Sequence, residues 1–166
     1  MRPAEPVRQV SATVPSIGSH EAEPIGRWTL KAGMDQPLDR LLRSSSILAL
    51  VVEDETVIRM ETADLLSVAG FSVLEAWNAT TALRQFERHP GIRLLVTDVQ
   101  MPRGLDGLAL ARTVAERWPE VGIVVISGVA TPAPDDLPPG ARFIAKPFTP
   151  RTVLAEIEAL IASGGH

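Results

Sequence analysis

The chain contains no cysteine among its 166 residues, which excludes disulfides, thiolate catalysis and cysteine-ligated metals. It also lacks an apolar run approaching the roughly 18 residues of a membrane span, and its amino terminus lacks the apolar core of a secretory signal. An excess of basic residues is missing as well, since the formal net charge is −4. We therefore expect a cytoplasmic protein with no nucleic-acid or membrane partner.

The first 45 residues differ in composition from the rest of the chain. They hold five prolines and show no sustained period of 2 or 3.6, so we expect residues 1–45 to be a disordered extension. Residues 35–43 carry leucines that a short helix would place on one side, and Met34 offers an alternative translation start. From residue 46 to residue 163 the pattern is regular, which predicts one folded domain.

In that region short apolar runs alternate with amphipathic segments. Strands are predicted at 47–52, 72–76, 92–97, 121–126 and 142–145. Helices are predicted at 55–69, 78–88, 106–118 and 149–162. This alternation indicates an α/β fold with a doubly wound, five-stranded parallel sheet in the flavodoxin-like order 2-1-3-4-5.

The stretch between the fourth and fifth predicted strands is rich in proline. Residues 129–142 include Pro132, Pro134, Pro138 and Pro139. Proline removes a backbone donor and disfavours helix at the residue before it. We therefore expect the fourth helix of the fold to be missing or reduced to a single turn around 135–137.

Polar side chains follow four of the five strands, at the sheet edge where parallel α/β proteins place their sites. They are Glu53, Asp54 and Glu55 after the first strand, Asp98 after the third, Ser127 after the fourth and Lys146 after the fifth. Each has an ordinary structural explanation by itself, as a helix-end acid, a turn residue or a surface lysine. Together they indicate more, because crowded carboxylates repel one another unless a cation lies among them, and Mg²⁺ prefers such ligands. A carboxylate beside Mg²⁺ is a competent nucleophile toward phosphorus, and a hydroxyl and an ammonium can stabilise the charge that develops.

These residues also lie in four short motifs. The motifs are 52–55 (VEDE), 97–102 (TDVQMP), 125–128 (VISG) and 143–148 (FIAKPF). Their order and positions resemble the receiver domain of two-component response regulators, of which the chemotaxis regulator is a stand-alone example. The resemblance covers about 47–162, nearly the whole of the predicted domain. The chain departs from the usual family pattern in having glutamate at position 53, a slightly longer loop at 101–107 and the proline-rich stretch.

The resemblance implies roles for the acidic residues. Asp98 would be the phosphoryl acceptor, and Asp54 and Asp98 would bind Mg²⁺. The backbone carbonyl of Gln100 would be a further metal ligand, and Glu53 would act through metal-bound water.

The resemblance also implies a switch on the other side of the site. Ser127 would be the switch hydroxyl, Lys146 would pair with the acyl phosphate, and Phe143 would be the switch aromatic. The Lys146–Pro147 peptide is expected to be cis.

The implied function is that of a single-domain response regulator, a phosphorylation switch or a phosphate relay or sink. It would take its phosphoryl group from a histidine kinase or phosphotransfer protein and would catalyse only its own phosphorylation and dephosphorylation. We expect a monomer that binds an unidentified effector through the last helix and the proline-rich stretch.

Three other functions remain as alternatives. A pseudo-receiver would bind proteins without being phosphorylated, but the intact Asp54, Asp98, Ser127 and Lys146 argue against it. A phosphatase of the haloacid dehalogenase type would need a second acid where Gln100 stands. A dinucleotide-binding enzyme would need a G-x-G-x-x-G motif after the first strand, and the sequence has none there.

Overall fold

Five apolar strands form a single parallel sheet in the order β2-β1-β3-β4-β5. The computed structural model describes residues 46–101, 104–129 and 131–164. The strands are β1 (Leu48–Val52), β2 (Ser72–Ala76), β3 (Ile92–Asp98), β4 (Gly122–Ser127) and β5 (Arg142–Ala145). The strand order predicted from the sequence is therefore confirmed, as are the strand positions to within one residue at each end.

Four α-helices connect or follow these strands. They are α2 (Thr56–Val68), α3 (Ala79–Arg88), α4 (Gly107–Arg117) and α5 (Pro150–Gly164). Short polar side chains cap the amino-terminal ends of α3 and α4: the Asn78 side chain accepts a hydrogen bond from the Thr81 N–H, and Asp106 accepts one from the Ala109 N–H. At the other end of α2, Gly70 takes a φ of 103°, a conformation that glycine adopts without strain.

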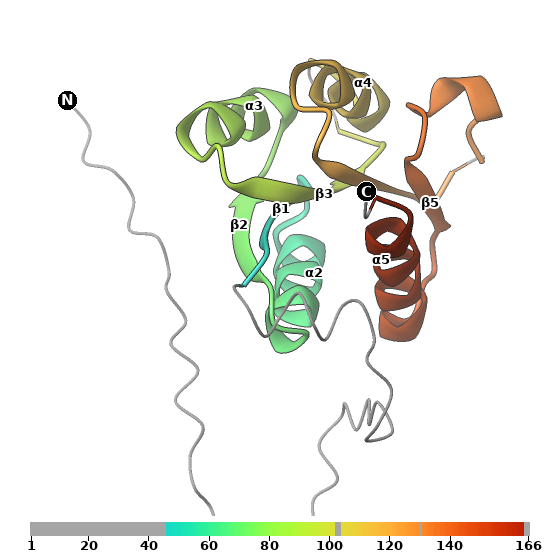
Figure 1. Ribbon diagram of the computed structural model, residues 1–166. Coiled ribbons are helices and arrows are strands. Elements are labelled where there is room, and N and C mark those ends of the chain that lie inside the picture. The colour runs from blue at the N-terminus through green and yellow to red at the C-terminus, as the bar shows by residue number, and fades with distance from the viewer. Residues whose placement is uncertain (1–45, 102–103, 130, 165–166) are drawn as a thin grey trace, which may run out of the picture. The chain divides into compact units, whose positions relative to one another are not determined.

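The helices cover both faces of the sheet. Figure 1 shows α3 and α4 on one face and α2 and α5 on the other. Alternate strand residues face the two layers, so that Leu50 and Val52 pack with the α3 and α4 side while Ala49 and Val51 pack with the α2 and α5 side. A strand buried on both faces must be apolar at every position, which explains the continuous apolar runs in the sequence.

The connection between β4 and β5 contains one short 3₁₀ turn, η1 (Pro134–Asp136), in place of an α-helix. We call residues 131–141 the strap. Its Leu137 packs against the α3 and α4 side of the core, and the Arg112 side chain of α4 donates a hydrogen bond of 3.2 Å to the Asp136 carbonyl. The predicted reduction of the fourth helix to a single turn is confirmed, and the prolines account for it.

Some expectations fall on parts of the chain that the structure leaves undescribed. The disordered extension, the short helix at 35–43 and the domain boundary at residue 46 lie at or before the first described residue, and residues 102–103 lie within the longer loop. These expectations stay predictions. Within the described ranges, no helix combines the length and the apolar character needed to span a membrane.

Candidate functional site

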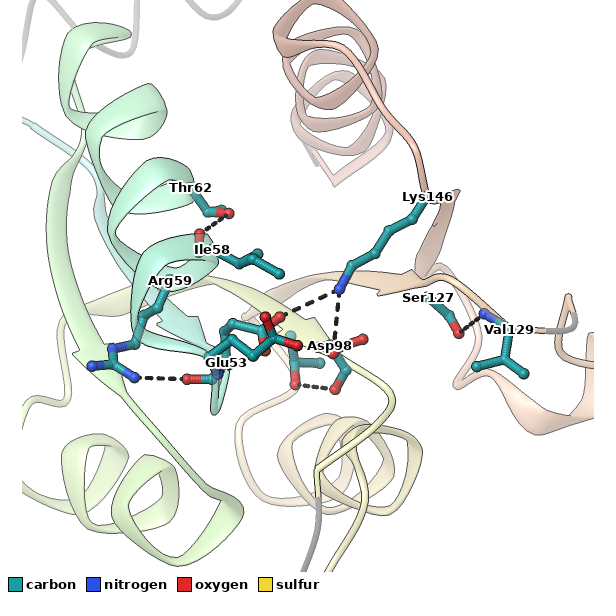
Figure 2. Close-up of polar contacts among 10 residues, drawn as sticks. Glu53, Ile58, Arg59, Thr62, Asp98, Ser127, Val129 and Lys146 are labelled. Atoms are coloured by element: carbon teal, nitrogen blue, oxygen red, sulfur yellow. Dashed lines mark hydrogen bonds and ion pairs between the residues drawn. The ribbon is translucent and has the colours of Figure 1, made fainter.

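The carboxyl ends of β1, β3, β4 and β5 bring the predicted polar side chains together. Figure 2 shows Lys146 pointing from the end of β5 toward Glu53 and Asp98, which follow or end β1 and β3. Ser127 is the last residue of β4, and the Lys146 N–H donates a 2.8 Å hydrogen bond to its carbonyl. Residues that are far apart in the sequence thus meet because parallel strands end at the same edge.

Lys146 forms ion pairs with two acids at once. Its Nζ lies 3.4 Å from Oδ2 of Asp98 and 3.5 Å from Oε2 of Glu53. The two carboxylates are buried, with side chains only 9% and 5% exposed, whereas the lysine side chain is 24% exposed. A cation in this position offsets part of the repulsion between two acids that water solvates poorly.

Burial changes the acidity of Glu53. Burial and the neighbouring carboxyls of Asp54 and Asp98 raise its pKa to about 7, well above the ordinary 4.5. The backbone N–H of Glu55 and the ammonium of Lys146 act in the opposite direction. Desolvation penalises the charged form, so the Glu53 carboxyl holds its proton up to nearly neutral pH when no metal is bound.

Three acidic residues are close enough together to bind one metal ion. Glu53, Asp54 and Asp98 each offer a carboxylate oxygen, and these oxygens lie within 4.8 Å of one another. Oδ1 of Asp98 is buried and has no hydrogen-bond partner among the described residues, which is unusual for a buried polar atom. Asp54 is the least buried of the three acids. A hard cation with oxygen ligands fits such a donor set.

Within the described part of the chain, three of the predicted site residues form no side-chain hydrogen bond or ion pair with the acids or with Lys146. Gln100 lies two residues beyond Asp98 and is exposed. The predicted role of Gln100 involves only its backbone carbonyl, so the exposure of the residue does not conflict with that role. The Ser127 hydroxyl is buried and accepts a 3.2 Å hydrogen bond from the Val129 N–H, also drawn in Figure 2. Phe143 lies on β5, is half-buried, and packs against the core on the α3 and α4 side of the sheet. The Lys146–Pro147 peptide is cis, as expected.

Two residues outside the predicted site, Thr97 and Gly107, contact the backbone of Asp98. The Thr97 hydroxyl donates a 3.0 Å hydrogen bond to the Asp98 carbonyl. Gly107, the first residue of α4, approaches the same carbonyl so closely that a Cβ atom there would lie 1.8 Å from its oxygen. The sequence did contain a signal for the contact at Gly107, which is a glycine directly after the helix-capping Asp106. Glycine does not stabilise a helix, so a glycine at this position indicates that another part of the chain approaches the backbone closely.

Arg59 is a third residue that the sequence analysis did not single out. Its Nη1 donates a 2.9 Å hydrogen bond to the backbone carbonyl of Glu53, and its Nε lies 3.3 Å from Oε1 of Glu75 on β2. The side chain is only 15% exposed. Figure 2 shows it reaching from α2 to the end of β1.

Comparisons with known proteins agree with this geometry. Residues 49–158 match the family described as the response regulator receiver domain. The response regulator receiver protein CpdR of Brucella abortus is 36% identical over 115 residues, which are 68% of this chain and 94% of that protein. Chemotaxis protein CheY1 of Helicobacter pylori is 30% identical over 120 residues, 69% of this chain and 96% of that protein. The crystal structure of a response regulator receiver protein from Sinorhizobium medicae superposes with a TM-score of 0.69 at 25% identity, covering 73% of this chain and 98% of that one.

Proposed function

Because the chain belongs to the response regulator receiver family of two-component systems, we propose that it accepts a phosphoryl group on Asp98 and acts as a phosphorylation switch or a phosphate relay or sink. The observation that carries the proposal is the environment of Asp98. Its Oδ1 is buried without a hydrogen-bond partner among the described residues, while Oδ2 is paired with Lys146. Lys146 therefore holds the carboxylate through Oδ2, and Oδ1 has no partner among the described residues that would compete with a metal ion.

The proposed reaction transfers a phosphoryl group between two nucleophiles. A carboxylate oxygen of Asp98 forms a bond to phosphorus as the bond from phosphorus to the donor atom breaks, and the electron pair of that bond leaves with the donor. The product is an acyl phosphate on Asp98. Hydrolysis of this acyl phosphate returns the carboxylate and releases inorganic phosphate.

The acidic residues fit a Mg²⁺ ion in this reaction. Asp54 and Asp98 would hold it directly, the backbone carbonyl of Gln100 would add a ligand, and Glu53 would hold a water molecule bound to it. When bound, the ion supplies positive charge that offsets the carboxylates and the incoming phosphate.

The residues at the ends of β4 and β5 act on the phosphorylated state. The ammonium of Lys146 already lies against Asp98 and would follow the charge onto the phosphoryl oxygens. The Ser127 hydroxyl would exchange its contact with Val129 for a donated hydrogen bond to the same group. This movement would shift the strap and Phe143, which lies on the neighbouring strand.

Receiver domains are signalling modules rather than enzymes that act on a separate substrate. In keeping with this, the chain would catalyse only its own phosphorylation and dephosphorylation. The phosphoryl donor would be a histidine kinase or phosphotransfer protein, and an effector would dock on α5 and the strap. The chain would be a monomer before and after phosphorylation, which light scattering can measure.

The proposal is tested by labelling with a small phosphodonor. With Mg²⁺ and acetyl phosphate, the wild-type protein should gain one phosphoryl group, seen in its intact mass. Asp98→Asn should gain none, because an amide is a poor nucleophile and lacks the charge. Asp64→Asn is the matched control, since Asp64 is an exposed acid on α2, and it should label like the wild type. Equal labelling of Asp98→Asn would contradict the assignment, and an unlabelled wild type would favour the pseudo-receiver.

A further inference from the structure

Arg59 contacts the backbone of the acidic loop rather than its carboxylates. The carbonyl that it binds belongs to the peptide unit shared by Glu53 and Asp54, and this unit is planar. A hydrogen bond to that carbonyl therefore sets the direction in which the chain carries Asp54. The other side of Glu53 is also held, since its N–H donates a 3.1 Å hydrogen bond to the Ala76 carbonyl of β2.

Glu75 completes this arrangement by holding the arginine. The guanidinium uses Nε for Glu75 and Nη1 for the Glu53 carbonyl, so its two donors face two different strands. The planar fork of arginine can satisfy both partners at once, which the single ammonium of lysine cannot do in the same geometry. The arginine side chain is also mostly buried, so its position is defined by packing as well as by hydrogen bonds.

We infer that Arg59 is a positioning residue for the metal site: held by Glu75, it fixes the peptide between Glu53 and Asp54 so that the acidic side chains are preorganised for a divalent cation. This inference rests on the proposed function. Groups that orient the ligands of a metal contribute to its affinity although they never touch the ion.

The direction in which Mg²⁺ affinity changes when Arg59 is replaced distinguishes a positioning role from a purely electrostatic one. If Arg59 acted through its charge, removing it would leave the acids more negative and would strengthen Mg²⁺ binding. If it acts through position, removing it frees the loop and weakens Mg²⁺ binding. The two explanations therefore predict opposite signs for the same substitution.

The experiment is a calorimetric titration of the unphosphorylated protein with Mg²⁺. Arg59→Gln, which is neutral and similar in length, should weaken Mg²⁺ binding about tenfold, the lower end of the range for groups that orient metal ligands. The rate of phosphorylation by acetyl phosphate should fall at low Mg²⁺ and recover most of its wild-type value at saturating Mg²⁺. A purely structural defect would not be recovered by added Mg²⁺.

Two further variants keep the test decisive. Arg59→Lys retains the charge and loses the fork, so it should bind Mg²⁺ with an affinity between those of the wild type and Arg59→Gln. If Arg59→Gln does not fold, the Mg²⁺ affinity of Arg59→Lys tests the inference in its place. Arg117→Gln is the matched control, because Arg117 pairs with Glu87 at 3.2 Å at the far end of α4, and its Mg²⁺ affinity should equal that of the wild type.

Unchanged or tighter Mg²⁺ binding by Arg59→Gln would overturn the inference, as would wild-type affinity in Arg59→Lys if that is the variant that folds. These outcomes differ from a failure of the proposed function, in which the wild-type protein itself would neither bind Mg²⁺ nor become labelled.

Discussion

Glu53 gives the site a group whose raised pKa lies near neutral pH. The lysine compensates the charge of Asp98 and Glu53, yet burial still raises the pKa of Glu53 to about 7. A metal ion that enters the site must therefore compete with a proton as well as with an ammonium group. Proton release on metal binding is the consequence that can be measured.

We predict that Mg²⁺ affinity rises with pH. Between pH 6 and pH 8 the affinity should increase about tenfold, because a carboxyl with a pKa near 7 changes from mostly protonated to mostly ionised over this range. Calorimetry in buffers of different ionisation enthalpy should report release of a proton below pH 7. Glu53→Gln cannot ionise and should show little pH dependence, so an equally steep dependence in that variant would assign the proton to another group.

The raised pKa of Glu53 also makes the stability of the folded protein depend on pH. Because the folded pKa of Glu53 lies above its unfolded value, the folded state binds the proton more tightly. The metal-free protein should therefore lose stability as the pH rises from about 4.5 to about 7, and the loss should stop above the folded pKa.

Gly107 offers a second prediction at this scale. Gly107→Ala should destabilise the fold by about 2 kcal/mol or more and slow phosphorylation, because its methyl group would displace the Asp98 carbonyl at the start of α4. Urea unfolding and the labelling rate measure the two effects. Gly91→Ala is the control, since a Cβ at Gly91 meets no atom within 4 Å. Equal stability of the two variants would show that α4 can shift without cost.

Among the elements of the fold, the buried strands and capped helices could be predicted from sequence because their signals are local. An apolar run such as that of β1, and a cap such as Asn78 before α3, are read from adjacent residues. The contacts of Arg59 could not be predicted in this way, since they depend on how α2 packs against a strand end, and the glycine after Asp106 indicated a close approach at Gly107 without identifying its partner. The prolines predicted the loss of a helix, while the hydrogen bond from Arg112 to the strap needed the three-dimensional structure.

The strap also connects the site to the aromatic residue on β5. It begins just beyond Ser127 and returns to the sheet at β5, where Phe143 pairs in register with Val125 of β4. Leu137 of the strap and Phe143 both pack against the core on the α3 and α4 side of the sheet. Ser127 also pairs in register with Ala145 of β5, two residues beyond Phe143, so the two strands link Ser127 to Phe143 directly.

We predict that phosphorylation alters the packing of Phe143. On binding of a phosphate mimic at Asp98, aromatic NMR signals of Phe143 should shift together with backbone signals of the strap. Phe71, which packs on the opposite face of the sheet, is the internal control and should stay unchanged. Ser127→Ala should suppress the response at Phe143, and a response confined to the immediate neighbours of Asp98 would refute the coupling.

At the scale of the whole molecule, the candidate site residues and the family match fall in the same part of the chain. Every candidate site residue lies between Glu53 and Lys146, and the family match covers 49–158. The acids and the lysine are contributed by three strands of one sheet, so the site requires that sheet and no residue from 1–45 has been assigned a role in it.

We therefore predict that the first residues are dispensable for phosphorylation. A protein beginning near Ser44 should be labelled by acetyl phosphate at a rate similar to that of the full chain, measured by intact mass over time. The full chain under the same conditions is the reference. A large loss of labelling would mean that residues 1–45 contribute to the site.

The position of Lys146 in the chain has a consequence for synthesis. The lysine pairs with Glu53 across 93 residues, and it follows β5, the last of the five strands of this sheet in chain order and an outer strand of it. Domains form as their segments emerge, so a nascent chain that ends before β5 carries the clustered acids without this counter-charge. On the proposed function, the site therefore becomes complete only after β5 and Lys146 have been synthesised, long after the acids that it serves.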